Sequence, residues 1–490
     1  MAEESRTQSA VGEPQPAAAP APAPAQPAPA AAPAQPAASR GPVYAMFAVV
    51  VLGAALGNLS QTAVNAIIND IMPQFGMSVE VGQWLTTLYM LMLGVTVPAV
   101  TFITKRFSVR QHTIAAFAIF ALGAFIDLVA PTFWLLLVGR VLQAIAAGML
   151  LPLLQTIAMM NFPPGKQATA MGIAGIALGF APNVGPTVGS LMSSAWGWRS
   201  LFLLLMVVAL VLGVAAAAAI RPAEPLDRTA TLDLWSVVLS ALGFGGLLLG
   251  FSNASSYAIT SPFIWLPILV GAVFLVCFVL RQKRIERPLV SMDIFRSSQY
   301  IHGFVAQNLL NISYMGITLV LPLYVEDLCG GTTVQAGMAL LPSTVMALIV
   351  NPLAGTLADR VGTRKVVVVT ACFLAVGATC MAFMDASTPM WMVMLFQGIR
   401  AVGVSGLISP LASWTLEKLP KRIVADGSSF STAVRQACAS FGTSLMVFAI
   451  TAVGATALGA AHPALAYQTA FGTSAVFAIA TLVYCVAKVR

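Results

Sequence analysis

Charge is scarce in this sequence. Only 9 % of its 490 residues are charged and 58 % are hydrophobic, whereas a soluble domain carries about a quarter charged residues. A surface with so little charge cannot face water, so we expect lipid to surround most of the chain. The formal net charge of +8 would also suit a nucleic-acid partner, but the positions of the basic residues favour a membrane protein with no such partner.

The residues that build metal sites, disulfides and catalytic centres are also few. Six cysteines form no C-x-x-C or other ligand spacing, and His112, His302 and His462 are scattered. The sequence therefore predicts neither a disulfide framework nor a metal site. Its apolar segments hold no Ser/His/Asp set and no paired acids, and the G-x-x-x-x-G-K-[ST] motif of ATP-driven pumps is missing. We predict a protein that is not an enzyme and needs no cofactor.

Apolar segments fill the chain after residue 42. Residues 1–42 form a Pro/Ala-rich stretch that cannot bury a core and is predicted to be a disordered cytoplasmic tail. Each later segment is long enough to cross about 30 Å of hydrocarbon as a helix, the only open-chain structure that satisfies its own backbone in lipid. The fourteen expected spans are 43–67, 80–103, 112–130, 132–157, 167–193, 199–219, 232–251, 261–281, 300–325, 334–358, 366–385, 389–415, 428–456 and 467–488.

Basic residues support this count of spans. With both termini in the cytoplasm, 21 of the 25 Lys and Arg residues fall in cytoplasmic segments, as the positive-inside rule requires. Arg140, Arg400 and Arg435 fall inside spans, where a charge costs about 2.5 kcal/mol or more. We expect Arg140 and Arg400 to face a polar cavity or a partner, whereas Arg435 could equally reach the interface.

A charged hairpin occurs twice, at matching places in the two halves of the chain. The full copy is GTLADRVGTRK at 355–365, and a degraded copy, TFITKRFSVRQ, lies 254 residues earlier at 101–111. The repeat predicts an all-α membrane protein with two six-helix bundles, at 43–220 and 300–490. An inserted helix pair with cytoplasmic linkers would occupy 221–299. Repeats around a central cavity are typical of alternating-access carriers.

The full hairpin resembles the G-x-L-A-D-R-x-G-x-R-K loop of the major facilitator superfamily, which lies between the second and third helix of each repeat. The resemblance implies a cytoplasmic gate in which Asp359 pairs with basic groups and a helix N-terminus. The degraded copy has Lys105 at the acid position, so we expect gating to rest chiefly on Asp359. The gate residues implied are Gly355, Asp359, Arg360, Gly362 and Arg364, with Arg106 and Arg110 of the first copy.

Two further motifs are similar to those of this superfamily. GRVLQAIAAG at 139–148 resembles R-x-x-Q-G-x-G of proton-coupled members, which implies a proton-coupling role for Arg140, with Gln143 one turn on along the same helix face. GFAPNVGPTVGS at 179–190 resembles the antiporter motif G-P-x-x-G-G, carried here by Gly185, Pro186 and Gly189. The antiporter motif favours an exporter, although small residues also serve plain helix packing.

Fourteen spans rather than twelve are typical of the drug:proton antiporter branch of that family. That branch usually carries an acid in helix 1, within L-D-x-T-I-V-N, but the chain reads LSQTAVN at 59–65 and so has Ser60 there. Asp127 is the only acid embedded in an expected span. We hypothesise that Asp127 carries the proton; the alternative is that it reaches the outer interface.

The resemblance implies proton-coupled efflux of small amphipathic molecules, such as drugs and antibiotics, across the bacterial plasma membrane. We expect alternating access by a monomer driven by the proton gradient. Without the acid of helix 1, neutral or monocationic substrates are expected over dications. The alternatives are a dedicated exporter of one metabolite, lipid or peptide and, more distantly, a membrane sensor. The candidate cavity residues, each of which could instead bond a neighbouring helix, are Gln61, Asn65, Gln143, Asn308, Asn311, Tyr314 and Arg400.

Overall fold

The computed structural model describes residues 40–77, 79–222, 232–254, 257, 261–286 and 288–489. Contacts divide the chain into two units, Met1–Arg40 and Gly41–Arg490. The tail expected at 1–42 therefore lies outside the described residues, except for its last three, which begin helix α1.

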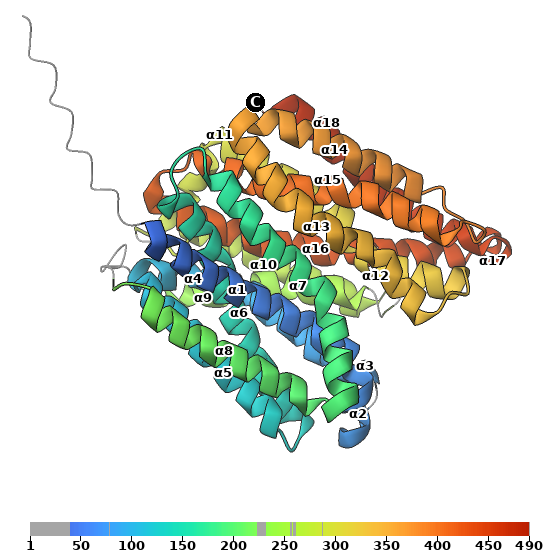
Figure 1. Ribbon diagram of the computed structural model, residues 1–490, viewed down its shortest axis with the longest axis horizontal. Coiled ribbons are helices and arrows are strands. Elements are labelled where there is room, and N and C mark those ends of the chain that lie inside the picture. Colours follow the sequence, from blue (N-terminus) through green and yellow to red (C-terminus); the bar gives the residue numbers. More distant parts are fainter. Residues whose placement is uncertain are drawn as a thin grey trace, which may run out of the picture. The chain divides into compact units, whose positions relative to one another are not determined.

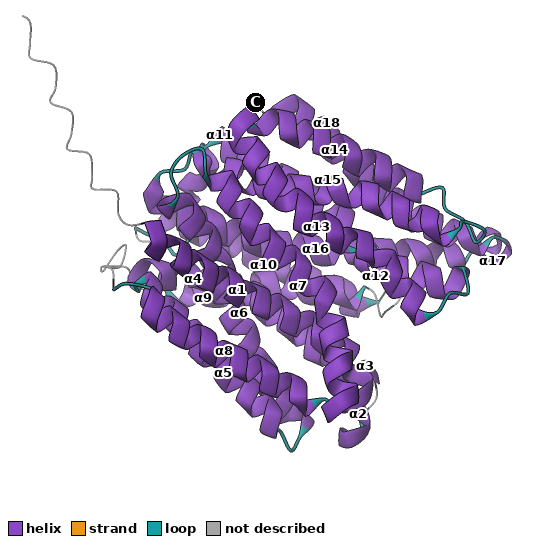
Figure 2. Ribbon diagram, in the orientation of Figure 1, coloured by secondary structure: helices purple, strands orange, loops and turns teal. Residues whose placement is uncertain are grey.

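Helices account for most of the described residues, among which no strand occurs (Figure 2). The first helix group comprises α1 (Arg40–Ala66), α2 (Ile68–Phe75), α3 (Val79–Gly82), α4 (Trp84–Arg106), α5 (Val109–Val129), α6 (Phe133–Asn161), α7 (Gln167–Trp196) and α8 (Arg199–Ala219). The inserted pair comprises α9 (Leu234–Asn253) and α10 (Pro262–Arg284), followed by the short helix η1 (Met292–Arg296). The second helix group comprises α11 (Ser298–Met315), α12 (Ile317–Leu323), η2 (Tyr324–Leu328), α13 (Thr333–Val361), α14 (Thr363–Met381), α15 (Met390–Glu417), η3 (Lys421–Ile423), α16 (Val424–Gly454), α17 (Ala457–Ala461) and α18 (Pro463–Lys488).

The helices match the expected membrane spans. Twelve of those described are long and apolar enough to cross a membrane, and the number reaches fourteen when bent α4 and α7 are each counted as one span. The bend in α7 is 42° and separates Gln167–Pro182 from Val184–Trp196. Proline explains it, because Pro182 and Pro186 both lack the N–H that would close a helical hydrogen bond.

Each helix group has its own internal packing. In the first group α5 packs against α6 and α8, and in the second α14 packs against α15 and α18. Figure 1 shows the first group in blue to green and the second in yellow to red. Residues from Gly41 on form one compact unit by contact, so the division into bundles with boundaries at 220 and 300 stays a prediction from the repeated hairpin.

The two groups contact each other along two surfaces. α7 packs along α13 and α15, and α16 packs against α4 and α6. The inserted pair lies beside this second contact, because α9 packs against α10, against α4 of the first group and against α16 of the second.

The two charged hairpins turn in different ways. Gly362 joins α13 to α14 with a φ of 94°, a left-handed conformation that glycine adopts without strain. The first copy has Ser108 at that position, with extended backbone, and Ser108 begins α5 through a capping box with Gln111. The same hairpin is thus made by a glycine turn in one half and by a helix cap in the other.

Candidate functional site

Four polar side chains meet inside the first helix group. Ser60 comes from α1, Asp127 from α5, and Arg140 and Gln143 from α6, and none of the four has exposed surface. Groups buried so deeply require partners, because an unpaired polar or charged group is costly away from water. We call these four residues the polar network.

Gln143 lies at the centre of the polar network. Its Nε2 donates to Oδ2 of Asp127 at 2.8 Å. Its Oε1 accepts from Oγ of Ser60 at 2.8 Å and from Nη1 of Arg140 at 2.7 Å. Nη1 of Arg140 also donates to Oγ of Ser60 at 2.8 Å. The acid and the arginine are therefore linked through one amide side chain.

Backbone and aromatic groups hold Arg140 in place. Its Nε donates to the carbonyl oxygen of Leu85 at 3.4 Å, and its guanidinium lies 4.2 Å from the centre of the Tyr89 ring. The hydroxyl of Tyr89 in turn donates to the carbonyl oxygen of Gly57 at 2.8 Å. Helices α1, α4 and α6 thus fix the position of this one cation.

Each charged side chain of the polar network has one polar atom that makes no hydrogen bond to a described residue. Among the described residues, Oδ1 of Asp127 and Nη2 of Arg140 have no hydrogen-bond partner. Asp127 can therefore accept a proton at Oδ1 without losing its bond from Gln143. The Asp127 side chain has no exposed surface and is directed toward α6, where Gln143 donates to it.

Two glycines allow Asp127 to come so close to α6. A Cβ atom on Gly139 would overlap Oδ1 of Asp127, and a Cβ atom on Gly123 would press against the carbonyl oxygen of Gly139. Gly139 immediately precedes Arg140, so this close contact between α5 and α6 lies directly beside the network.

The second helix group buries a comparable arginine. Arg400 of α15 is only 3 % exposed, and its Nε donates to Oε1 of Gln397 at 2.9 Å. Nε2 of Gln397 donates to Oγ of Ser343 on α13 at 2.5 Å. No ion pair found among the described residues includes Arg400. Arg140 in the first group is thus linked to an acid through Gln143, whereas Arg400 in the second group bonds to a neutral side chain.

Asp359 of the full hairpin contacts the opposite helix group. Its Oδ1 accepts from the backbone N–H of Ala168 at 3.3 Å. Its Oδ2 accepts from the N–H and the hydroxyl of Thr169, at 2.7 Å and 2.6 Å. These donors lie in the first turn of α7, where the helix dipole is positive. One turn earlier on α13, the missing side chain of Gly355 lets the backbone approach Ala168 and Gly172.

The basic gate candidates have other surroundings. Arg110 donates from Nη2 to the carbonyl oxygen of Ala217 at 2.9 Å, at the end of α8 in its own helix group. Arg106, Arg360 and Arg364 are exposed.

The glycines of the antiporter motif face α1. A Cβ atom on Gly185 would meet the hydroxyl of Thr62, and one on Gly189 would meet the carbonyl oxygen of Ala63. Pro186 is exposed. The second part of α7 therefore packs within the first helix group, whereas its first part packs on α13.

The structure gives several candidate cavity residues a partner in a helix. Nδ2 of Asn308 donates to the carbonyl oxygen of Phe304 at 2.8 Å, and Nδ2 of Asn311 to that of Gln307 at 2.7 Å. Asn65 is exposed and accepts from the hydroxyl of Thr86. Gln61 and Tyr314 are partly buried. Of the seven candidates, Gln143 is the one placed in the polar network.

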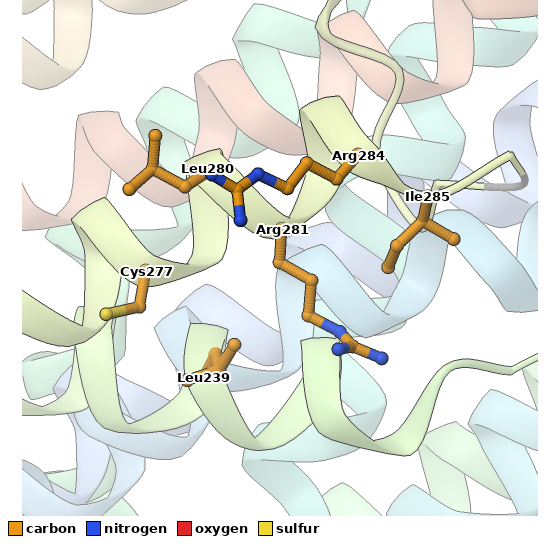
Figure 3. A pocket seen from close by; sticks show the side chains of 6 residues that line it. All are labelled: Leu239, Cys277, Leu280, Arg281, Arg284 and Ile285. Atoms are coloured by element: carbon orange, nitrogen blue, oxygen red, sulfur yellow. The ribbon is translucent and has the colours of Figure 1, made fainter.

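A surface hollow of about 370 Å³ lies on the inserted pair, lined by Leu239, Cys277, Leu280, Arg281, Arg284 and Ile285 (Figure 3). Arg281 donates to both carboxylate oxygens of Asp233, at 2.9 Å and 3.0 Å. These bonds hold the pKa of Asp233 below its ordinary value. No member of the polar network lines this hollow.

Two residues of these contacts were not among the sequence candidates. In the sequence Ser60 stands out only because it replaces an acid, and its hydrogen bond with Arg140 leaves no local pattern. Asp426 forms an ion pair with Lys105. It was not a candidate because it lies just before the expected span 428–456. An acid at the start of an apolar segment is a signal for a helix N-terminus, and it could have been used here.

A multi-pass membrane transporter is the class of protein that these spans, the two helix groups and the buried network define. The chain belongs to the Major Facilitator Superfamily, whose family model matches residues 50–443 and 303–489. The membership and the all-helical fold predicted from the hairpins are therefore confirmed, and membership in a transporter family agrees with the prediction that the chain is not an enzyme.

Relatives and solved structures cover most of the chain. The uncharacterized MFS-type transporter YcnB of Bacillus subtilis is 31 % identical over 440 residues, which make up 89 % of this chain and 91 % of YcnB. The lincomycin resistance protein LmrB of Listeria monocytogenes is 29 % identical over 412 residues, or 83 % of this chain and 85 % of LmrB. The human organic anion transporter MFSD10 superposes with a TM-score of 0.64, covering 91 % and 99 % of the two chains, and at 13 % identity it shares the fold alone.

Proposed function

We propose that this transporter exports small amphipathic drugs in exchange for protons, across a bacterial plasma membrane and with both termini in the cytoplasm. The observation that carries the proposal is the polar network, in which a buried acid and a buried arginine are linked through Gln143. Similarity to a lincomycin resistance protein supports a drug as the cargo. The orientation rests on the positive-inside rule.

Asp127 is the proton carrier in this mechanism. While it is ionised, its charge offsets that of Arg140 in surroundings where charges interact strongly. A proton on Oδ1 cancels the negative charge and leaves the Arg140 charge uncompensated. That state favours a conformation in which Arg140 is hydrated or meets substrate, so protonation shifts the population of the carrier. Ser60 is neutral and adds no second proton site on α1.

Asp359 links the same cycle to the movement of the helix groups. Its three hydrogen bonds to the first turn of α7 latch α13 to the first helix group on the proposed cytoplasmic side. Access from that side requires these bonds to break. The small residues of the antiporter motif keep the far part of α7 against α1, so α7 moves with the first helix group.

Drug uptake into inverted membrane vesicles under an imposed pH gradient tests the proton carrier. Asp127→Asn keeps the shape and an acceptor oxygen for Gln143 but cannot be ionised. We expect this variant to lose gradient-driven uptake while it retains drug binding and drug–drug exchange without a gradient. Asp293→Asn, at the exposed ion pair with Arg296, is the matched control and should behave as the parent protein. Undiminished gradient-driven uptake by Asp127→Asn would exclude Asp127 as the carrier.

A further inference from the structure

The degraded hairpin contacts the second helix group through an ion pair. Lys105 lies in the last turn of α4, and its Nζ is 2.7 Å from Oδ1 of Asp426 on α16. Asp426 has no exposed surface, and the side chain of Lys105 is 19 % exposed. The pair is therefore largely withheld from water and joins residues that are 321 positions apart in the sequence.

The ion pair occupies a place equivalent to that of Asp359. Asp359, near the end of α13, contacts Thr169, the third residue of α7. Lys105, near the end of α4, contacts Asp426, the third residue of α16. Each hairpin thus meets the first turn of a helix from the opposite group. The difference is polarity, because the first hairpin brings the cation and the helix carries the acid.

Helix dipoles explain why the reversed arrangement is stable. A lysine directed at a bare helix N-terminus would be repelled by the positive end of the dipole. Asp426 in the first turn of α16 changes that repulsion into attraction, and it is itself favoured at this end of the helix. Lys105 in the last turn of α4 is equally favoured at the negative end of its own helix. Each charge therefore suits its helix before the two meet.

Neighbouring groups hold the start of α16 beside the pair. Ser428 donates to the carbonyl oxygen of Pro152 on α6 at 3.0 Å, and Tyr300 donates to that of Gly427 at 3.0 Å. Phe430 packs edge-on against Phe295 of η1, with ring centres 5.4 Å apart. With Asp426 fixed among these contacts, separation of the pair requires movement of α16 relative to α4 and α6.

We infer that Lys105 and Asp426 form a second latch between the helix groups, with the opposite polarity to the latch of Asp359. The inference rests on the proposed alternating-access function. It revises the expectation that gating depends chiefly on Asp359, because the first hairpin keeps a latch through its cation. Opening of this end then requires both latches to break. Breaking the second leaves the buried charge of Asp426 to be hydrated or to find a new partner.

A charge exchange tests the second latch. Lys105→Asp and Asp426→Lys each place like charges together in a buried site, whereas the double variant restores an ion pair. We expect each single variant to lower drug uptake in inverted vesicles by about tenfold or more. The double variant should recover part of the rate, because its ion pair is restored while each exchanged charge opposes the dipole of its own helix. Exchange of the exposed pair Arg296 and Asp293 is the control and should change little.

A conformational measurement separates failure of the latch from failure of the export proposal. Spin labels are attached to cysteines introduced at exposed Phe107 and Arg422 in a variant whose six native cysteines have been replaced. The distance between the labels reports the separation of the α4 hairpin from the start of α16 without any substrate. The single variants should populate longer distances and the double variant should return to the parental distribution. This result would support the latch even if no drug were transported.

Specific outcomes would overturn the latch. Parental distances and uptake in both single variants would do so, as would a double variant no better than the singles. If a single variant does not accumulate as folded protein, the neutral pair Lys105→Met with Asp426→Asn takes its place. It leaves no unpaired buried charge, so it should fold and shift the distances, and parental distances would contradict the inference.

Discussion

Ser60 illustrates how one side chain sets the charge of a buried site. Its hydroxyl donates to Gln143 and accepts from Arg140, so it completes the hydrogen bonding without adding a charge. The site thus contains one acid, Asp127, and one base. An acid at residue 60 would instead pair directly with Arg140 and compete with Asp127.

The charge of the preferred substrates should follow from the presence of a single acid in this site. We expect neutral and monocationic drugs to be transported better than dications, because the second cation of a dication finds no acid at Ser60. Competition between a monocation and a dication of similar size, measured as uptake in inverted vesicles, checks this. Ser60→Asp should move the preference toward the dication. A parental protein that transports the dication best would contradict the prediction.

Gly139 controls how Asp127 meets Gln143. Gly139→Ala places a methyl group where Oδ1 of Asp127 lies, and overpacking of this kind costs about 1–3 kcal/mol. We expect the carboxylate to be displaced from Gln143, with reduced gradient-driven uptake and an altered dependence on external pH. Gly472→Ala on α18, where an added Cβ meets nothing within 4 Å, is the matched control. Equal pH profiles for Gly139→Ala and the parent protein would exclude this positioning role.

At the scale of the element, the hairpins show how similar positions are stabilised by different chemistry. The α13–α14 turn uses the left-handed conformation of Gly362, and the α4–α5 turn uses the capping box of Ser108. Loss of the glycine from the first copy therefore does not imply loss of the turn. Loss of the acid from the first copy likewise does not remove the contact with the opposite helix group, because Lys105 pairs with Asp426 on α16.

A graded series at Asp359 should separate charge from hydrogen bonding. Asp359→Asn keeps an acceptor for Thr169 but loses the interaction with the dipole of α7, which contributes about 0.3–1 kcal/mol. Asp359→Ala also loses hydrogen bonds to a charged group, worth about 1.5–3 kcal/mol each. We expect drug uptake to fall in the order parent, Asn, Ala. Thr169→Val, which removes only the hydroxyl bond, should resemble the Asn variant; equal rates in all four proteins would exclude the latch.

At the scale of the whole molecule, the sequence predicts the spans better than the site. Apolar length and the positive-inside rule define fourteen segments because lipid acts on each helix separately. Helix ends are predicted less well, since polar turns such as that of Asp426 continue α16 beyond its apolar part. Contacts between distant helices leave no local pattern. The sequence alone therefore singles out Asp127 and Arg140, but it cannot show that Gln143 joins them.

The inserted pair has a consequence for how such a molecule moves. α9 is packed against α4 and also against α16; Gly94 of α4 fits against Leu248, and Ser444 of α16 donates to the carbonyl oxygen of Phe251. A helix attached to two bodies cannot follow both when they rotate apart. In the proposed alternating-access cycle, each turnover would shear one of these surfaces or bend α9, so the stiffness of the inserted pair would help to set the transport rate.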